Sequence, residues 1–364
     1  MAIKASGGNP PSNSLSFTEI ENEFGQNASR SLGDYRMNNL NIGALTEVSL
    51  SRDGCGISAN SSIPVDNQEI KFSDFFSAKQ NIILDFHSNN QNRVNAKNDK
   101  YNASSPSGNY TVVGSAGNSK PSSTNGKKVI IHVTKVIGSS QGNVNNVALR
   151  TGNWDSGTEL LVEVDGGTVI GAGGNGGNGQ SNNVGTPGTD GTSGLGIDYN
   201  GTKIQTAENG LIACGFGGGG AGGGARTKRE GSSWGGGRGP TVNIAGSGGG
   251  GGQGAPGGSG GSGGANGTAG DHEQAGEGGP ETEAESVESG VVGGNGGEGG
   301  HTGDASADAG EAGSLNGSRH EDPNTAGPGI GGGNGAAIRK NGSVNFTLIG
   351  SPNIVGDQNA TGVS

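Results

Sequence analysis

The first helical pattern of apolar positions lies near the start of the chain. Phe17, Ile20 and Phe24 recur at the three- and four-residue spacing of one helix face. The surrounding motif, apolar-x-Phe-[Ser/Thr]-acidic-apolar, appears a second time within residues 70–76. We therefore expect two similar helix starts in a small α/β module that spans residues 1–78.

The ends of the first helix are also marked in the sequence. Ser16 stands three residues before Glu19, which is the spacing of a capping box. Gly25 directly follows the last apolar position, where a glycine commonly ends a helix. The pattern therefore predicts a short, capped helix that begins near Ser16 and stops before Gly25.

Strand-like patterns take over between residues 79 and 165. Several segments there are rich in β-branched residues and are separated by Asn, Gly and Ser turns. These segments are 81–87, 109–113, 128–137 and 159–165. A small β-sandwich or a stack of short strands would suit them, and this region is the part of the chain best able to form an ordinary apolar core. We expect a β-sandwich-like spacer domain over residues 79–165.

From residue 166 to the C-terminus the pattern becomes glycine runs interrupted by short apolar strips. The chain has 82 glycines in 364 residues, and only 28% of its residues are hydrophobic. Because glycine has no side chain to bury, a conventional core cannot form in such runs. Composition alone favours a flexible linker. Collagen and the calcium-binding β-roll fit poorly, since neither repeat persists in phase.

A third structure is available to the glycine runs. Chains in the polyproline II conformation have three residues per turn and no internal hydrogen bonds, so their N–H and C=O groups point outward. Glycine keeps the N–H donor and lacks a Cβ, so several such helices can approach until these groups bond to each other. The apolar strips between runs and the strand-like end at 342–349 favour this structure over a linker. We expect a C-terminal bundle of packed polyglycine II helices over residues 166–364, in a chain that is mostly β and irregular.

The charge of the chain is concentrated in one segment. The net charge is −11, and residues 271–322 carry thirteen acidic side chains against the single basic residue Arg319. This pattern argues against a nucleic-acid partner, because phosphate contacts need clustered Lys and Arg. The simplest interpretation of the acidic run is a solvated face.

The sequence also argues against a membrane protein, a disulfide framework and an enzyme. No apolar run approaches the length of a membrane span, and the first 30 residues do not resemble a signal peptide. Cys55 and Cys214 lie far apart, so we expect incidental thiols in a soluble protein made in a reducing compartment. The five histidines are scattered, and we expect each to be solvated or in a turn. We therefore predict no catalytic residues, no metal site and no cofactor.

Candidate recognition residues lie in the polar loops between the glycine runs, because binding residues often sit on loops presented by a rigid scaffold. The strongest candidate segment combines cations with one of two tryptophans, residue types that often dominate binding surfaces. Its members are Lys228, Arg229, Trp234 and Arg238. Weaker candidates lie in the acidic loops, where plain solvation is the alternative. These are His272, Glu273, Arg319 and His320.

The sequence resembles bacteriophage tail proteins in several segments. One group looks like a module found at the start of many phage virion proteins, and the other is similar to the entry into glycine-rich domains of phage tail tips. The segments are 16–20, 24–25, 31–35, 63–64 and 70–75 for the first group, and 159–179 and 209–224 for the second. The implied relatives include the adhesins at the distal end of T-even-type long tail fibres, in which packed glycine helices carry loops that bind the host.

The resemblance implies a virion tail protein made in the host cytoplasm. Residues 1–78 would dock to other phage tail proteins, and the loops of the glycine-rich region would bind a host surface protein or polysaccharide. The alternative is a structural or decoration protein of the tail without receptor binding. Such tail proteins are commonly homotrimers, but no heptad repeat or intertwining segment in this sequence requires three chains.

Overall fold

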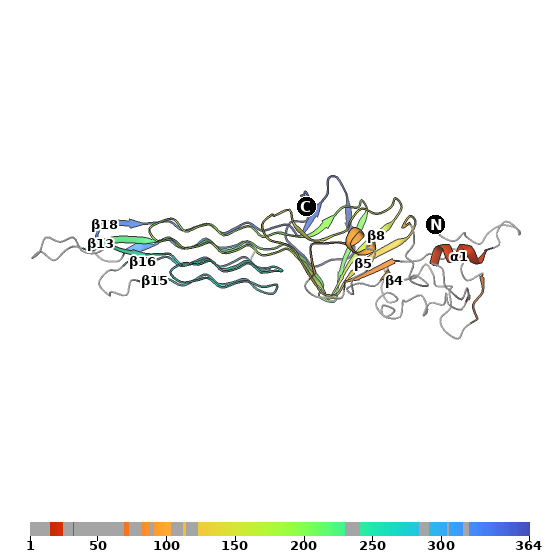
Figure 1. Ribbon diagram of the computed structural model, residues 1–364, viewed down its shortest axis with the longest axis horizontal. Coiled ribbons are helices and arrows are strands. Elements are labelled where there is room, and N and C mark those ends of the chain that lie inside the picture. The colour runs from red at the N-terminus through yellow and green to blue at the C-terminus, as the bar shows by residue number, and fades with distance from the viewer. Residues whose placement is uncertain are drawn as a thin grey trace, which may run out of the picture.

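The computed structural model describes residues 15–24, 32, 69–72, 82–86, 91–102, 112–113, 123–229, 241–283, 291–303, 306–315 and 320–364. Figure 1 shows an elongated molecule with a β-rich body and a long arm that runs away from it. We call residues 171–192 and 214–335 the arm. None of the described helices is both long enough and apolar enough to cross a membrane.

The predicted N-terminal helix is confirmed as α1 (Phe17–Phe24). Its capping box is formed as expected: the Glu19 N–H donates to the Ser16 hydroxyl at 3.2 Å, and the Ser16 N–H donates to a Glu19 carboxylate oxygen at 2.7 Å. Phe72 lies edge-on to Phe17, with ring centroids 6.2 Å apart. Most of the expected module over residues 1–78, and the helix start expected after Phe72, lie outside the described residues.

The body consists of three sheets in which neighbouring described strands run parallel, apart from one antiparallel edge strand. The first sheet has the order β20 (Phe346–Leu348), β11 (Thr202–Ala207), β8 (Glu159–Asp165), β5 (Lys128–Val133), β1 (Ile82–Phe86) and β4 (Val112–Val113). The second has the order β22 (Ala360–Thr361), β19 (Ile338–Lys340), β10 (Ser193–Ile197), β7 (Val147–Arg150) and β3 (Val94–Asn95). The third has the order β2 (Gln91–Asn92), β6 (Val136–Gly138), β9 (Thr168–Ile170), β12 (Leu211–Ala213) and β21 (Ile354–Val355).

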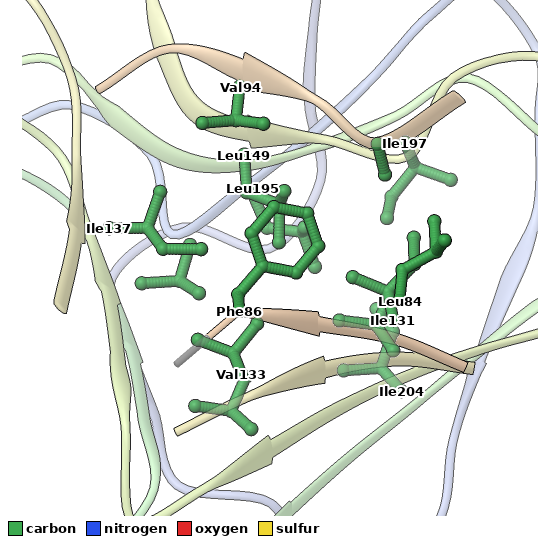
Figure 2. Packing of buried hydrophobic residues seen from close by; sticks show 14 of the residues in the cluster. Leu84, Phe86, Val94, Ile131, Val133, Ile137, Leu149, Leu195, Ile197 and Ile204 are labelled. Atoms are coloured by element: carbon green, nitrogen blue, oxygen red, sulfur yellow. The ribbon is translucent and has the colours of Figure 1, made fainter. Parts of the chain in front are cut away.

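The strand order is that of a three-sided β-helix, which we call the coil. The chain visits the first, third and second sheets in turn, as in β5, β6 and β7, so each turn of the coil adds one strand to every sheet. The apolar faces of the sheets point inward. Figure 2 shows Phe86 and Ile131 of the first sheet, Leu149 and Leu195 of the second, and Ile137 of the third meeting in one core. Burial of these side chains is the main stabilising contribution to the body.

The expected strands at 81–87 and 159–165 are present as β1 and β8. The segment 128–137 is divided between β5 and β6 of two different sheets, and the arrangement differs from a β-sandwich. The sheets also continue past residue 165, because β10, β11, β12 and β19 to β22 belong to them. The physical reason is visible in β5, where five consecutive residues from Val129 are buried. Parallel strands that are covered on both faces have near-continuous apolar runs, and such runs do not distinguish between sheet architectures.

The arm enters and leaves the body at one corner. The chain departs after β9 and returns at β10, and it departs again after β12 and returns before β19. Both excursions therefore lie between the third and the second sheet. In the other turns of the coil the same corner is closed by Arg93, by residues 139–146 and by residues 356–359. The glycine-rich region is thus inserted into the coil at two of its turns.

Backbone hydrogen bonds join the glycine-rich segments of the arm to each other. The segments are 171–179, 185–192, 214–224, 245–254, 257–264, 266–271, 275–281, 294–302, 307–313 and 326–335. The bonds recur every third residue. The N–H groups of Gly173, Gly176 and Gly179 donate to the carbonyls of residues 256, 259 and 262 at 2.9, 2.8 and 2.7 Å. A flexible linker would not have such a regular set of bonds.

The packing distances in the arm explain why glycine is needed. A Cβ built on Gly176 would lie 2.0 Å from the carbonyl oxygen of Gly249, and one on Gly219 would lie 2.0 Å from that of Gly297. Real Cβ atoms are not found so close to other heavy atoms. The segments therefore approach each other more closely than any side chain would permit, and the backbone bonds depend on that approach.

The strand ends of the second sheet are joined by a buried carboxylate. Asp198 accepts two hydrogen bonds from the Arg150 guanidinium, at 2.7 and 3.1 Å, and others from the Gly152 N–H and the Asn341 amide.

Replacing Asp198 with alanine should lower the free energy of unfolding by about 2 kcal/mol, because hydrogen bonds to charged groups are each worth roughly 1.5–3 kcal/mol. Urea unfolding followed by circular dichroism would measure this loss. A value within experimental error of the wild type would contradict it.

Candidate functional site at the far end of the arm

Two small sheets end the arm at the side away from the body (Figure 1). One consists of β14 (Thr241–Ile244), β13 (Ala225–Arg229) and β18 (His320–Thr325), and the other of β15 (Thr282–Glu283), β16 (Val291–Gly293) and β17 (Ser314–Leu315). Strands of the two sheets contact each other, since β16 packs against both β13 and β14. We call this region the far end.

Antiparallel pairing at the far end brings together candidate residues that are distant in the sequence. Arg229 of β13 lies opposite His320 of β18, and Lys228 lies opposite both Glu321 of β18 and Thr241 of β14. Trp234 and Arg238 fall between β13 and β14, and Arg319 directly precedes β18; these residues lie outside the described part of the chain. The strand ends to which they attach nevertheless belong to one small sheet.

The change from glycine runs to strands follows from the sequence of β13. Its residues Ala-Arg-Thr-Lys-Arg carry side chains, and Ala225 and Thr227 alternate as buried positions. Such alternation is typical of a strand with one covered face. The close glycine packing therefore ends at Gly224, and a sheet whose residues carry long side chains begins at Ala225.

The described strand ends that flank three connections lie together at the far end. Residues 230–240 join β13 to β14, residues 284–290 join β15 to β16, and residues 316–319 join β17 to β18. All of these strands lie at the far end, so the connections begin and end there. The first segment and its flanking strands carry Lys228, Arg229 and Arg238, whereas residues 281–288 are acidic. Basic and acidic segments therefore start from neighbouring sheets.

His272 and Glu273 do not lie at the far end. They belong to a turn that closes against the body, in which the Asp271 N–H donates to the Gln274 carbonyl at 2.8 Å. The Gln253 side chain holds this turn by donating to the His272 carbonyl at 3.0 Å. The structure therefore separates these two candidates from the Lys228, Arg229 and His320 group by the length of the arm. Sequence spacing could not reveal this, because each pass along the arm ends in a similar polar turn.

The electrostatics of this turn are determined by its backbone. Asp271 accepts hydrogen bonds at one carboxylate oxygen from the N–H groups of Glu273 and Gln274, at 2.7 and 2.9 Å. These bonds stabilise the ionised form and lower the pKa of Asp271 below its usual value. The turn is therefore anionic at neutral pH.

One histidine differs from its expected environment. His132 was expected to be solvated or in a turn, but it is buried in β5, with its Nε2 3.3 Å from a carboxylate oxygen of Asp165. Both residues belong to the first sheet of the body, far from the arm's far end. The signal that could have placed His132 inside was its position within the near-continuous β-branched run of 128–133, which is typical of a strand covered on both faces.

The described residues offer little catalytic chemistry. Among them, no group of three His, Cys, Asp or Glu side chains is arranged to hold a metal ion. Cys214 is buried, and burial raises the pKa of its thiol to about 12, so it is neutral and a poor nucleophile. Cys55 lies outside the described residues.

One family model matches most of the chain. A family model described as "Phage tail fibre adhesin Gp38" matches residues 85–359. A crystal structure of the gp37–gp38 adhesin tip complex of the bacteriophage S16 long tail fibre includes a similar chain, with 17% identity over 94% of this chain and 96% of that one, and a TM-score of 0.36. No curated protein matches the sequence.

Proposed function

The chain belongs to the Gp38 family of phage tail fibre adhesins, and on this premise we propose that its arm presents the far-end connections to the host surface as a rigid recognition platform. Membership of the family makes the protein a tail-fibre adhesin and a component of the phage tail. Membership of an adhesin family points to a structural, non-catalytic role, and in this proposal the protein has no enzymatic activity.

The arm is, in this proposal, a bundle of polyglycine II helices. The three-residue recurrence of its backbone bonds supports the assignment, because a polyproline II helix has three residues per turn. The close approach at Gly176 and Gly219 supports it as well. Each bond contributes only about 0.5–1.5 kcal/mol net, so the rigidity of the bundle depends on the large number of such bonds.

Host recognition is placed at residues 230–240, 284–290 and 316–319. The main observation that supports this proposal is the pairing of Arg229 in β13 with His320 in β18. It brings together the strand ends that flank residues 230–240 and 316–319, which are distant in the sequence. Trp234 and Arg238 lie in the first of them, and Trp and Arg are the residues most often dominant at binding surfaces. The occupant would be a host surface protein or polysaccharide.

Attachment to the phage is placed at the opposite end of the molecule. Helix α1 lies beyond the body, on the side away from the arm (Figure 1). Phe72, next to this helix, is 42% exposed. We assign residues 1–78 to docking on another tail fibre protein, which would leave the arm free to extend toward the host.

The test is a double substitution, Trp234→Ala with Arg229→Ala. We expect the adsorption rate of phage carrying this variant to fall by at least about tenfold, because truncating a dominant contact costs more than about 1–2 kcal/mol. The melting temperature should not change, since Arg229 is the last residue of β13 and Trp234 falls in the sequence between β13 and β14, so neither belongs to a strand of the body or to a glycine segment. Adsorption assays on host cells and thermal unfolding of the purified protein provide the two readouts.

The matched control is Glu277→Ala with Glu298→Ala, two exposed residues along the side of the arm. This control should adsorb normally. Unaltered adsorption of the Trp234 and Arg229 variant would remove this segment from the site. Failure of purified wild-type protein to compete with phage for host cells would favour a purely structural role in the tail.

A further inference from the structure

A cleft lies where the arm meets the body, at the end of the arm opposite to the proposed recognition platform. Its volume is about 630 Å³. The body contributes Asn92 of β2 and Val136 of β6, and the arm contributes Pro256, Asp271 and His272. Small-molecule sites commonly occupy about 300–1,000 Å³ at the junction of two structural units, and the volume and position of this cleft fall in that range.

The floor of the cleft is rigid because backbone contacts join the two units there. The Ser139 N–H donates to the Ala255 carbonyl at 2.8 Å, and a Cβ on Gly138 would lie 2.1 Å from that carbonyl oxygen. The Gln141 side chain donates to the Gly173 carbonyl at 2.8 Å, which adds a second tie between body and arm. The backbone of body and arm is therefore joined at the cleft before any ligand arrives.

Both hydrogen-bond donors and acceptors line the cleft. The Asn92 side chain uses its oxygen to accept from Ser140 at 3.4 Å, which leaves its amide N–H groups available. Asp271 uses one carboxylate oxygen for the backbone bonds of its turn, which leaves the other as an acceptor. The exposed imidazole of His272 can donate or accept. Val136, Ala255 and Pro256 add apolar surface.

We propose that this cleft is a second binding site, separate from the far end, for a neutral or amine-bearing mono- or disaccharide. A sugar presents many hydroxyl groups, which need donors and acceptors together, and an apolar C–H face, which suits Val136 and Pro256. The ionised Asp271 in the cleft lining opposes an anionic ligand, so uronic acids and sugar phosphates are disfavoured. The inference goes beyond the adhesive role of the far end and does not depend on it.

The experiment is ligand-observed saturation-transfer NMR on the purified full-length protein. The probes are glucose, galactose, N-acetylglucosamine, glucosamine and glucuronic acid. We expect saturation transfer to at least one of the neutral or amine-bearing sugars and none to glucuronic acid. Because the readout is direct binding, its result is independent of the adsorption assay for the far end.

Two variants locate the binding in the cleft. Asn92→Trp should abolish the signal, because Asn92 is exposed and a tryptophan there fills the cleft without entering the core. His272→Ala should weaken binding at least about fivefold, which corresponds to the loss of about one hydrogen bond. Glu273→Gln is the matched control; its side chain is 81% exposed and lies outside the cleft lining, so binding should change less than twofold.

Three results would overturn the proposal. They are the absence of transfer to every sugar in the panel, an undiminished signal in folded Asn92→Trp and His272→Ala proteins, and a preference for glucuronic acid. Circular dichroism of each variant verifies that it is folded. His272→Ala lies on an exposed turn, so it keeps the test decisive if the tryptophan variant does not fold.

Discussion

Replacing Gly219 with alanine is expected to unfold the arm while the body stays folded. The added Cβ would lie 2.0 Å from the Gly297 carbonyl oxygen and 2.6 Å from its carbon. Both are backbone atoms of a neighbouring segment, so no side-chain rotation can relieve the overlap. Gly219 also donates to Gly250 at 2.8 Å and accepts from Gly177 at 2.9 Å, and separating the segments would break these bonds. We expect a loss of roughly 3 kcal/mol or more, at the upper end of overpacking effects.

Amide hydrogen exchange of residues 214–335 measures this effect directly, and phage adsorption should fall with it. Gly327→Ala is the matched control in the same arm, because a Cβ there meets no atom within 4 Å and its φ is not positive. The control should be neutral, or more stable by up to about 1 kcal/mol through reduced entropy of the unfolded chain. Equal exchange in the two variants would contradict the close-packed lattice.

Replacing Phe86 with alanine is expected to destabilise the body by about 3–5 kcal/mol, the usual cost of truncating a buried aromatic residue. Phe86 is fully buried, and it lies at the centre of the core that all three sheets share (Figure 2). Because both excursions of the arm start from strands of this coil, loss of the core should also loosen the base of the arm. Chemical unfolding followed by circular dichroism would measure the change.

The matched control for this prediction is Phe72→Ala, which removes the same side chain from a position that is 42% exposed. It should cost less than about 1 kcal/mol, since little buried surface is lost. If both variants lost the same stability, the three-sheet core would not be the main source of stability in the body.

Local features of this protein were readable from its sequence. The capping box at Ser16 and the apolar spacing that follows it predicted α1 correctly, because a helix and its cap depend on residues within one turn of each other. The β-branched segments predicted β5 and β8 for the same reason. The resemblance to tail-fibre adhesins agrees with the family to which the chain belongs.

The global arrangement required the tertiary structure. In the coil, each strand pairs with strands from the turns before and after it, and two of those turns contain the long excursions of the arm. The two-residue strands β21 and β22 therefore join sheets whose other strands lie far away in sequence. Such short segments carry no periodicity of their own. The longer strands β10 and β11 lie within the glycine-rich region, so the sequence pattern did not assign them to the body.

The arm shows most clearly which features follow from the sequence and which require the tertiary structure. Its composition alone implies that side chains cannot stabilise it, because glycine has none, and that backbone groups must bond between segments if the region is to be ordered. One glycine run offers the same N–H and C=O groups as another, so composition does not specify which runs become neighbours. The positions at which the chain leaves and re-enters the sheets of the body determine which runs become neighbours. They also place Arg229 opposite His320 at one end of the arm and His272 at the other end.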